Sequence, residues 1–124
     1  MLIKGSGEVV EGAASAASDL IKDTTTQGFR EDVVTASMSQ PVLVDFWAPW
    51  CEPCKQLTPV LEKVVKAAGG KVKLVKMNIE EHPQIAGQLG VQSIPAVFAF
   101  TRGQPVDGFT GALPEAHLVA NIIY

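Results

Sequence analysis

Short apolar runs mark the strands expected in this chain. The run 42–47 is nearly continuous in apolar residues, which is typical of a strand covered on both faces. In 71–79 the side chains alternate, so Leu74 and Lys76 share one face of the expected strand. Turn-forming residues separate these runs. We therefore expect five strands, at 18–24, 42–47, 71–79, 96–100 and 106–110.

A helical repeat of apolar positions, three and four residues apart, dominates 52–68. Pro59 lies inside this segment and should kink the helix, and Gly69-Gly70 should end it. The stripe that faces the core is expected to consist of Leu57, Val60, Leu61, Val64, Val65 and Ala68. Three further helices are expected: from Thr25 or Thr26 to Met38, from Pro83 to Leu89, and from Leu113 onward.

The elements follow the order β-α-β-α-β-α-β-β-α, which is the pattern of an α/β fold. Connections through helices imply parallel strand pairs, and the final hairpin implies an antiparallel edge strand. The sequence thus predicts a central mixed β-sheet of about five strands flanked by about four helices. Residues 1–17 are rich in Gly, Ala, Ser and Glu and are expected to form a flexible N-terminal extension to one domain, 18–124.

Composition excludes several classes of function. The chain has 124 residues, a net charge of −3 and 47% hydrophobic residues, so it lacks the basic character of a nucleic-acid-binding protein. No apolar run approaches the ~20 residues of a membrane span. No apolar segment of a secretory signal follows Lys4. We expect a cytoplasmic protein with no nucleic-acid or membrane partner, in which two cysteines form a bond that opens and closes.

Both cysteines lie in the segment 50–55, Trp-Cys-Glu-Pro-Cys-Lys, at the start of the expected helix. Cys51 and Cys54 are one helical turn apart, which places their Cα atoms within the roughly 4.4–6.8 Å that a disulfide requires. The first turn also offers unpaired N–H groups and the positive end of the helix dipole. Cys51 should therefore have a lowered pKa and be reactive.

Two other uses of the cysteine pair are less well supported. A structural zinc site takes four ligands, so His82 and His117, which are distant in the sequence, would have to converge on both cysteines. A purely structural disulfide would close a very short loop and constrain the unfolded chain little. We expect a redox pair, with no metal and no cofactor.

Asp45 interrupts the apolar strand 42–47. A carboxylate in a buried strand is costly unless it is paired or protonated. Asp45 either turns to a strand end and meets water, or it is a carboxyl with a raised pKa that takes a proton near neutral pH. Lys76 either pairs with Asp45 or extends its ammonium group to solvent. The residues alone leave both questions open.

The run 44–55, Val-Asp-Phe-Trp-Ala-Pro-Trp-Cys-Glu-Pro-Cys-Lys, resembles the active-site signature of the thioredoxin family. The departure is Glu52, where thioredoxins carry glycine. Outside the motif, the chain is similar to the N-terminal domain of bacterial thioredoxin–tetratricopeptide co-chaperones (chaperedoxins). Further matches in the family's order and spacing, over about residues 20–124, are Pro59, Lys76, Ile94-Pro95 and Gly111.

The resemblance implies a thioredoxin fold and a substrate-binding surface around Cys51. It implies a cis bond between Ile94 and Pro95, and a flat apolar surface made by Trp50 and Pro95. The backbone of Ile94 would offer hydrogen bonds to an extended substrate, a form of strand addition. Gly111 would leave room for a partner where a side chain would block it.

The expected function is that of a thiol–disulfide oxidoreductase that reduces protein disulfides. Cys51, at the exposed end of the turn, would attack as a thiolate, and the more buried Cys54 would then resolve the mixed disulfide. Asp45 would accept the proton of Cys54, directly or through a water. The resemblance implies that Lys76 pairs with Asp45 and tunes it. Expected partners are protein disulfides and a thioredoxin-reductase-like electron donor.

The two residues between the cysteines, Glu52 and Pro53, should tune the redox pair. The negative charge of Glu52 beside Cys51 disfavours the thiolate in a partly solvated site and should also weaken binding of acidic substrates. The redox potential of the family is therefore not carried over to this chain, because the residues between the cysteines influence it.

A second hypothesis assigns the chain to a different class, a redox-assisted co-chaperone or binding module. Such a module would recognise unfolded proteins or a chaperone, with little or no reductase turnover. The similarity to chaperedoxins and the Ala- and Ser-rich extension 1–17 favour it. Both cysteines, Asp45 and Pro95 favour the enzyme.

Overall fold

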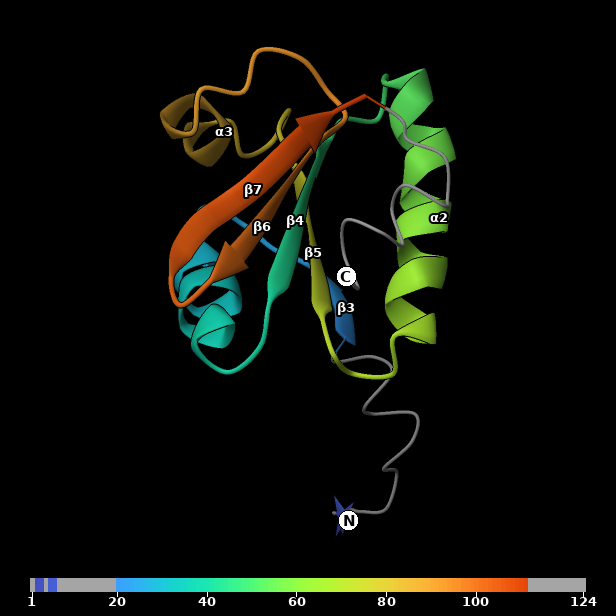
Figure 1. Ribbon diagram of the computed structural model, residues 1–124, viewed down its shortest axis with the longest axis vertical. Helices are drawn as coiled ribbons and strands as arrows, with labels where there is room; N and C mark the ends of the chain where they lie inside the picture. The colour runs from blue at the N-terminus through green and yellow to red at the C-terminus, as the bar shows by residue number, and fades with distance from the viewer. Residues whose placement is uncertain (1, 4, 7–19, 112–124) are drawn as a thin grey trace.

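The computed structural model describes residues 2–3, 5–6 and 20–111. A mixed five-stranded sheet lies at the centre, in the order β3-β5-β4-β6-β7 (Figure 1). The α/β class and the five strands predicted from the sequence are confirmed. The strands are β3 (Ile21–Asp23), β4 (Val42–Trp47), β5 (Lys73–Asn78), β6 (Ala96–Thr101) and β7 (Gln104–Thr110).

The two ends of the chain were predicted as an extension and a final helix. Near the N-terminus, β1 (Leu2–Ile3) and β2 (Gly5–Ser6) form a short parallel pair. The rest of the predicted extension, apart from these two strands, lies outside the described residues, as does the helix predicted from Leu113. Both therefore stay predictions.

Strand pairing differs from the prediction at β6. β3 and β4 each pair in parallel with β5, but β6 runs antiparallel to β4, and β7 antiparallel to β6. The connection through α3 (Gln84–Gln88) was expected to produce a parallel strand. A helix of this length spans only about 8 Å, whereas a six-residue strand spans about 20 Å. The chain therefore re-enters the sheet at the end where β4 and β5 finish (Figure 1).

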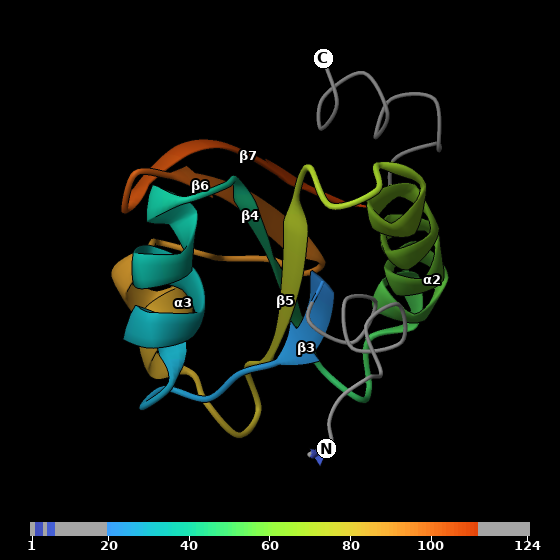
Figure 2. The same ribbon diagram turned by 90° about the horizontal axis from the view of Figure 1, so that it is seen from below.

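Helices cover both faces of the sheet (Figure 2). One face carries α2 (Glu52–Ala67), one residue shorter than predicted because Ala68 is its C-cap. The other carries α3, η1 (Arg30–Thr35) and η2 (Ala36–Met38).

The helix predicted to reach Met38 departs from α geometry. The expected capping contact is present, because the Thr25 hydroxyl accepts a hydrogen bond from the N–H of Gly28 at 2.9 Å, but residues 26–28 form a turn and η1 begins only at Arg30. The segment then continues as a π-helix in η1 and a 3₁₀ helix in η2. Three consecutive β-branched residues, 33–35, crowd the helix backbone and favour this departure.

The core consists of two layers separated by the sheet. In β5, Leu74 faces α2, whereas Val75 and Met77 face η1 and α3, as the alternation predicted. The α2 layer contains the predicted stripe, with Leu57, Leu61, Val64 and Val65 buried and Val60 partly buried. In the other layer, two edge-to-face aromatic pairs, Phe29–Phe100 and Phe46–Phe98, have ring centroids 5.7 and 5.8 Å apart.

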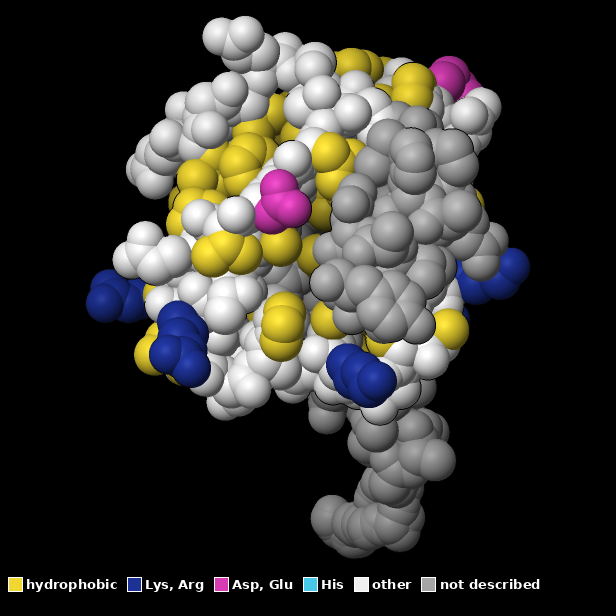
Figure 3. Space-filling view, in the orientation of Figure 1, with side chains coloured by type: hydrophobic (Ala, Val, Ile, Leu, Met, Phe, Trp, Pro, Cys, Tyr) yellow, Lys and Arg dark blue, Asp and Glu magenta, His cyan; other side chains and the backbone are white. Residues whose placement is uncertain are grey.

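The surface is uneven in character. Figure 3 shows hydrophobic side chains gathered over the part of this face near α3 and β7, and Lys and Arg side chains spread along its lower margin. β7 is an exposed edge strand, and Val106 on it is 62% exposed. None of the described helices has the length and apolarity needed to cross a membrane.

Truncating the contact between α2 and the sheet should destabilise the whole domain. Leu61 is fully buried against this face, so Leu61→Ala should lower the free energy of unfolding by about 2–5 kcal/mol. Gln56→Ala, on the exposed side of α2, should change it by less than about 0.5 kcal/mol. Urea denaturation measures both. Equal effects of the two substitutions would contradict the assigned packing.

Candidate active site

The turn between β4 and α2 carries both cysteines. The N–H of Cys51 donates to the carbonyl of Ala48 at 3.1 Å, which closes the turn. Cys51 is the N-cap of α2, and its Sγ accepts a hydrogen bond from the N–H of Cys54 at 3.2 Å. This sulfur therefore lies at the positive end of the helix dipole, where negative charge is stabilised. The environment predicted for Cys51 is confirmed.

Cys51 and Cys54 are joined by a disulfide, and the chain has no other cysteine. Their Cα atoms lie 5.3 Å apart. Because this separation is inside the range that a disulfide requires, the bond fits the first turn of α2 without displacing the backbone. The predicted ability of the two sulfurs to join is confirmed.

The prediction that Cys51 is exposed is wrong for this disulfide form. Cys51 is only 4% exposed and Cys54 1%. Both pack in a small apolar cluster with Ala48, and Ile94 lies against it. Because the turn folds Cys51 back onto the start of α2, its sulfur is covered on most sides. The little exposed area of the pair is mainly that of Cys51, so an incoming thiol meets Cys51 first.

Asp45 is a fully buried carboxyl on β4, the strand that leads into the turn with the cysteines. It has no exposed surface, which excludes the solvated strand-end alternative. Its Oδ2 accepts a hydrogen bond from the Thr58 hydroxyl at 2.8 Å, and its Oδ1 has no partner within the described part of the chain. Burial raises the pKa of Asp45 to about 6, against the lowering effects of Thr58 and Lys76. The burial that the alternative of a carboxyl with a raised pKa requires is therefore present.

Lys76 does not form the predicted ion pair with Asp45. The two residues are opposite each other in the β4–β5 register, but Lys76 Nζ bonds to Glu62 Oε2 on α2 at 2.9 Å. Glu62 is about one-third exposed and keeps part of its hydration, whereas Asp45 is desolvated. Burial lowers the pKa of Lys76, but the hydrogen bond to Glu62 together with the charges of nearby carboxylates outweighs it, and the pKa is raised. Lys76 acts on Asp45 only through its charge.

Two chain segments distant in sequence meet at the disulfide. The Ile94–Pro95 bond is cis, as the family resemblance implied, and Ile94 packs against the cysteine cluster. The N–H of Gly111, after β7, donates to the carbonyl of Pro95 at 2.8 Å. Gly111 has φ of 85°, and a Cβ built there would meet no atom of residues 20–111 within 4 Å. Its backbone conformation alone therefore favours glycine.

The apolar surface beside the cysteines differs from the expected one. Trp50 is 64% exposed, but Pro95 is buried. The two were expected to form a flat surface together. Because Pro95 directly precedes β6 and is held inside the fold, only Trp50 of the two offers exposed apolar area.

The residues between the cysteines lie in the exposed first turn of α2. Pro53 fits there because the first turn needs no backbone donor from it. Glu52 pairs with Lys55 at 3.1 Å, and their side chains are 77% and 57% exposed. Lys55 therefore offsets part of the negative charge that was expected to act on Cys51, although an exposed pair is weak and screened by salt.

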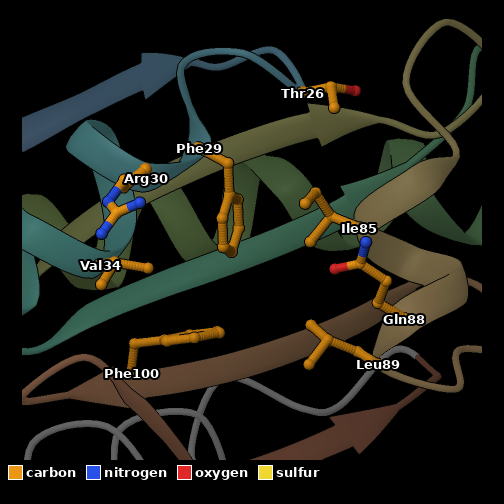
Figure 4. A pocket seen from close by; sticks show the side chains of 8 residues that line it. All are labelled: Thr26, Phe29, Arg30, Val34, Ile85, Gln88, Leu89 and Phe100. Carbon is orange, nitrogen blue, oxygen red and sulfur yellow. The ribbon is translucent and has the colours of Figure 1, made fainter.

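A cavity of about 290 Å³ opens beside Cys54. Its walls include Trp47, Thr58, Pro59 and Lys76. A larger apolar cavity, of about 370 Å³, lies on the opposite side of the sheet, where Phe29, Ile85 and Leu89 point toward one another (Figure 4). Because η1 and α3 frame it and α2 does not, this second cavity is separate from the cysteines.

Sequence reasoning missed Thr58 and Glu62. Both follow Cys54 on α2 at steps of four residues, so the three side chains lie in one row along the helix. That row faces Asp45 and Lys76. A search for polar residues at this spacing after Cys54 would have found both.

His82 was considered as a metal ligand in the sequence. Its Nδ1 accepts a hydrogen bond from the N–H of Thr26 at 3.3 Å, and His117 lies outside the described residues. No group of three or more His, Cys, Asp or Glu side chains suited to a metal ion occurs among the residues that the structure describes.

Comparison with known proteins gives a consistent result. The thioredoxin family model matches residues 20–124. Thioredoxin 1 of Nostoc sp. is 45% identical over 94 residues, which are 76% of this chain and 86% of that protein. The thioredoxin of Synechocystis sp. is 46% identical over the same shares. The thioredoxin of Rickettsia bellii is 44% identical over 81% of this chain and 93% of its own length.

The mixed sheet and the cysteine pair at the start of α2 define a thiol–disulfide oxidoreductase. With relatives of this identity over most of its length, the chain belongs to the thioredoxin family. It has the thioredoxin fold and is a protein-disulfide reductase.

Replacing Asp45 with Asn should change how stability depends on pH. The pKa of Asp45 rises from 3.8 to about 6 on folding, so the folded protein holds a proton that the unfolded chain has released. The free energy of unfolding therefore falls as pH rises through this range, by about 3 kcal/mol. Asp45→Asn should remove this decline and be more stable at neutral pH. Urea denaturation across the range measures it.

The matched control is Asp107→Asn, the same chemical change on exposed β7. It should keep the decline of the parent protein. If Asp45→Asn kept it as well, another group would be responsible.

Proposed function

We propose that this protein reduces disulfides of other proteins with Cys51 as the attacking thiolate and Cys54 as the resolving thiol. The observation that carries the proposal is the hydrogen bond from the Cys54 N–H to Cys51 Sγ at the N-cap of α2. It singles out Cys51 as the sulfur that is stabilised as an anion. Cys54, inside the helix and 1% exposed, is placed to act second.

The reaction proceeds in two exchanges. The Cys51 thiolate attacks one sulfur of the substrate disulfide, forms a mixed disulfide and releases the other sulfur as a thiolate. The Cys54 thiolate then attacks Cys51 Sγ and releases the second substrate sulfur, so that two electrons pass to the substrate. The protein is left with the Cys51–Cys54 disulfide. A thioredoxin-reductase-like donor in the cytoplasm would restore the dithiol.

Asp45 accepts the proton that Cys54 must lose before its attack. Its pKa of about 6 keeps it ionised at neutral pH while leaving it a usable proton acceptor. Lys76 and Glu62 adjust this affinity through their charges, Lys76 favouring and Glu62 disfavouring the carboxylate.

Substrate chains dock where Trp50, Ile94 and Gly111 surround the disulfide. Trp50 contributes exposed apolar surface. Ile94 lies against the cysteine cluster, and its backbone would form hydrogen bonds with an extended substrate by strand addition. Among residues 20–111, no atom lies within 4 Å of a Cβ built at Gly111, which bonds to Pro95, so this position leaves room for a partner.

The co-chaperone alternative remains the second candidate, because the exposed indole of Trp50 could also bind apolar segments of unfolded proteins. It differs from the reductase in what the cysteines contribute. A binding module keeps its effect on unfolded proteins without them, whereas a reductase does not.

The two cysteine variants should fail at different steps. In an insulin-reduction assay with dithiothreitol, the parent protein should accelerate the reduction. In Cys51→Ser and in Cys54→Ser this acceleration should be at least about 100-fold smaller. Only Cys54→Ser should accumulate a mixed disulfide with substrate, detected by mass spectrometry. No acceleration by the parent protein would favour the binding module, and trapping by Cys51→Ser instead would reverse the assignment.

Replacing Glu52 with Gly should make reduced Cys51 more reactive. Removal of a negative charge one residue away favours the thiolate, so alkylation by iodoacetamide below neutral pH should be up to about tenfold faster. Lys55→Gln should have the opposite effect, because it leaves Glu52 uncompensated. Both differences should shrink at high salt. Equal or slower alkylation of Glu52→Gly would refute the tuning role.

A further inference from the structure

Thr58 lies between two groups that the reaction needs, the thiol of Cys54 and the carboxyl of Asp45. It lies four residues after Cys54 on α2, so both side chains are on the same face of the helix. Cys54 and Thr58 both line the cavity of about 290 Å³. Asp45 is fully buried, and the hydroxyl of Thr58 donates to its Oδ2 at 2.8 Å.

The orientation of this hydroxyl is informative. A threonine inside a helix commonly donates to the carbonyl four residues earlier, which here belongs to Cys54. Thr58 donates to the Asp45 carboxylate instead. A hydroxyl oxygen has two lone pairs, so it can accept one hydrogen bond from the cavity while it donates another to Asp45. The Thr58 hydroxyl can therefore accept one proton and give up another, and it remains a neutral hydroxyl.

The charged surroundings of Asp45 come from two elements. Lys76 on β5 favours the carboxylate, and Glu62 on α2 disfavours it. These two groups are bonded to each other at 2.9 Å. Among the residues that the structure describes, only Thr58 donates a hydrogen bond to the Asp45 carboxylate.

We propose that Thr58 is the positioning residue that relays the Cys54 proton to Asp45. This inference rests on the proposed function. A water in the cavity takes the Cys54 thiol proton and gives a proton to Thr58 Oγ1, while the hydroxyl's own proton moves to Asp45 Oδ2. Cys54 becomes the thiolate that attacks Cys51 Sγ, Asp45 becomes the neutral acid, and water and Thr58 are regenerated. One proton crosses, and the electron pair of the broken bond leaves on the substrate sulfur.

The test separates the two exchanges of the proposed reaction. Reduced protein is mixed rapidly with a symmetrical aryl disulfide that releases a coloured thiolate. The first coloured thiolate reports attack by Cys51, and the second reports resolution by Cys54. Both are followed as a function of pH in the parent protein, Thr58→Val and Thr58→Ser. Loss of the first release in the parent protein would overturn the proposed function itself.

Thr58→Val keeps the shape of the side chain and removes the hydroxyl. The first release should stay within about twofold of the parent, and the second should slow by at least about tenfold at neutral pH. Because Asp45 loses a donor to its ionised form, the rising limb of the second release should also move to higher pH. Thr58→Ser should restore both rate and pH profile. Should Thr58→Val fail to fold, Thr58→Ala carries the same expectation.

The double substitution Asp45→Asn/Thr58→Val decides whether the two residues act together. If Thr58 acts through Asp45, the double variant should resolve the mixed disulfide no more slowly than Asp45→Asn alone. Multiplying losses would show independent effects and overturn the relay. An unchanged second release in Thr58→Val, with an unshifted pH limb, would also overturn it while leaving the proposed function intact.

Discussion

The packing of α2 against the face of the sheet made by β4 and β5 determines where every reactive group lies. Leu57 and Leu61 of the helix are buried against Leu43 and Leu74 of the strands. This contact fixes the start of the helix beside the end of β4, and with it the position of Cys51 at the N-cap. The hydrophobic layer has no chemistry of its own, but it sets the geometry on which the disulfide depends.

The same contact forces a carboxyl into the interior. Asp45 lies under α2 with neighbours Thr58 and Glu62 on that helix and Lys76 on the next strand. Thr58 donates a hydrogen bond to the carboxylate. Lys76 and Glu62 form a partly exposed ion pair, and their charges adjust the electrostatic potential at Asp45. Burial raises the pKa of Asp45, whereas the hydrogen bond from Thr58 and the charge of Lys76 lower it, so the pKa stays at about 6.

The sequence was sufficient for the elements whose patterns are strong. The alternation in 71–79, the stripe of α2 and the continuous run of β4 each led to the observed strand or helix and to the correct buried face. The spacing of Cys51 and Cys54 predicted their disulfide for the same reason, since helical geometry is local.

Properties that depend on distant contacts could not be predicted in this way. The preference of Lys76 for Glu62 depends on how deeply each carboxylate is buried. The low exposure of Cys51 depends on Ile94 arriving from another segment. The π geometry of η1 follows from crowding that no periodicity detects.

The shortness of α3 has a consequence for how this architecture can change. Because that helix is too short to carry the chain back along the sheet, Ile94 and Pro95 arrive at the end where β4 delivers the cysteines. An insertion that lengthened α3 into a full crossover would send this segment to the far end of the sheet. The site would then be dismantled although none of its own side chains had been altered, so the length of one remote helix is as much a part of the active site as the sulfurs.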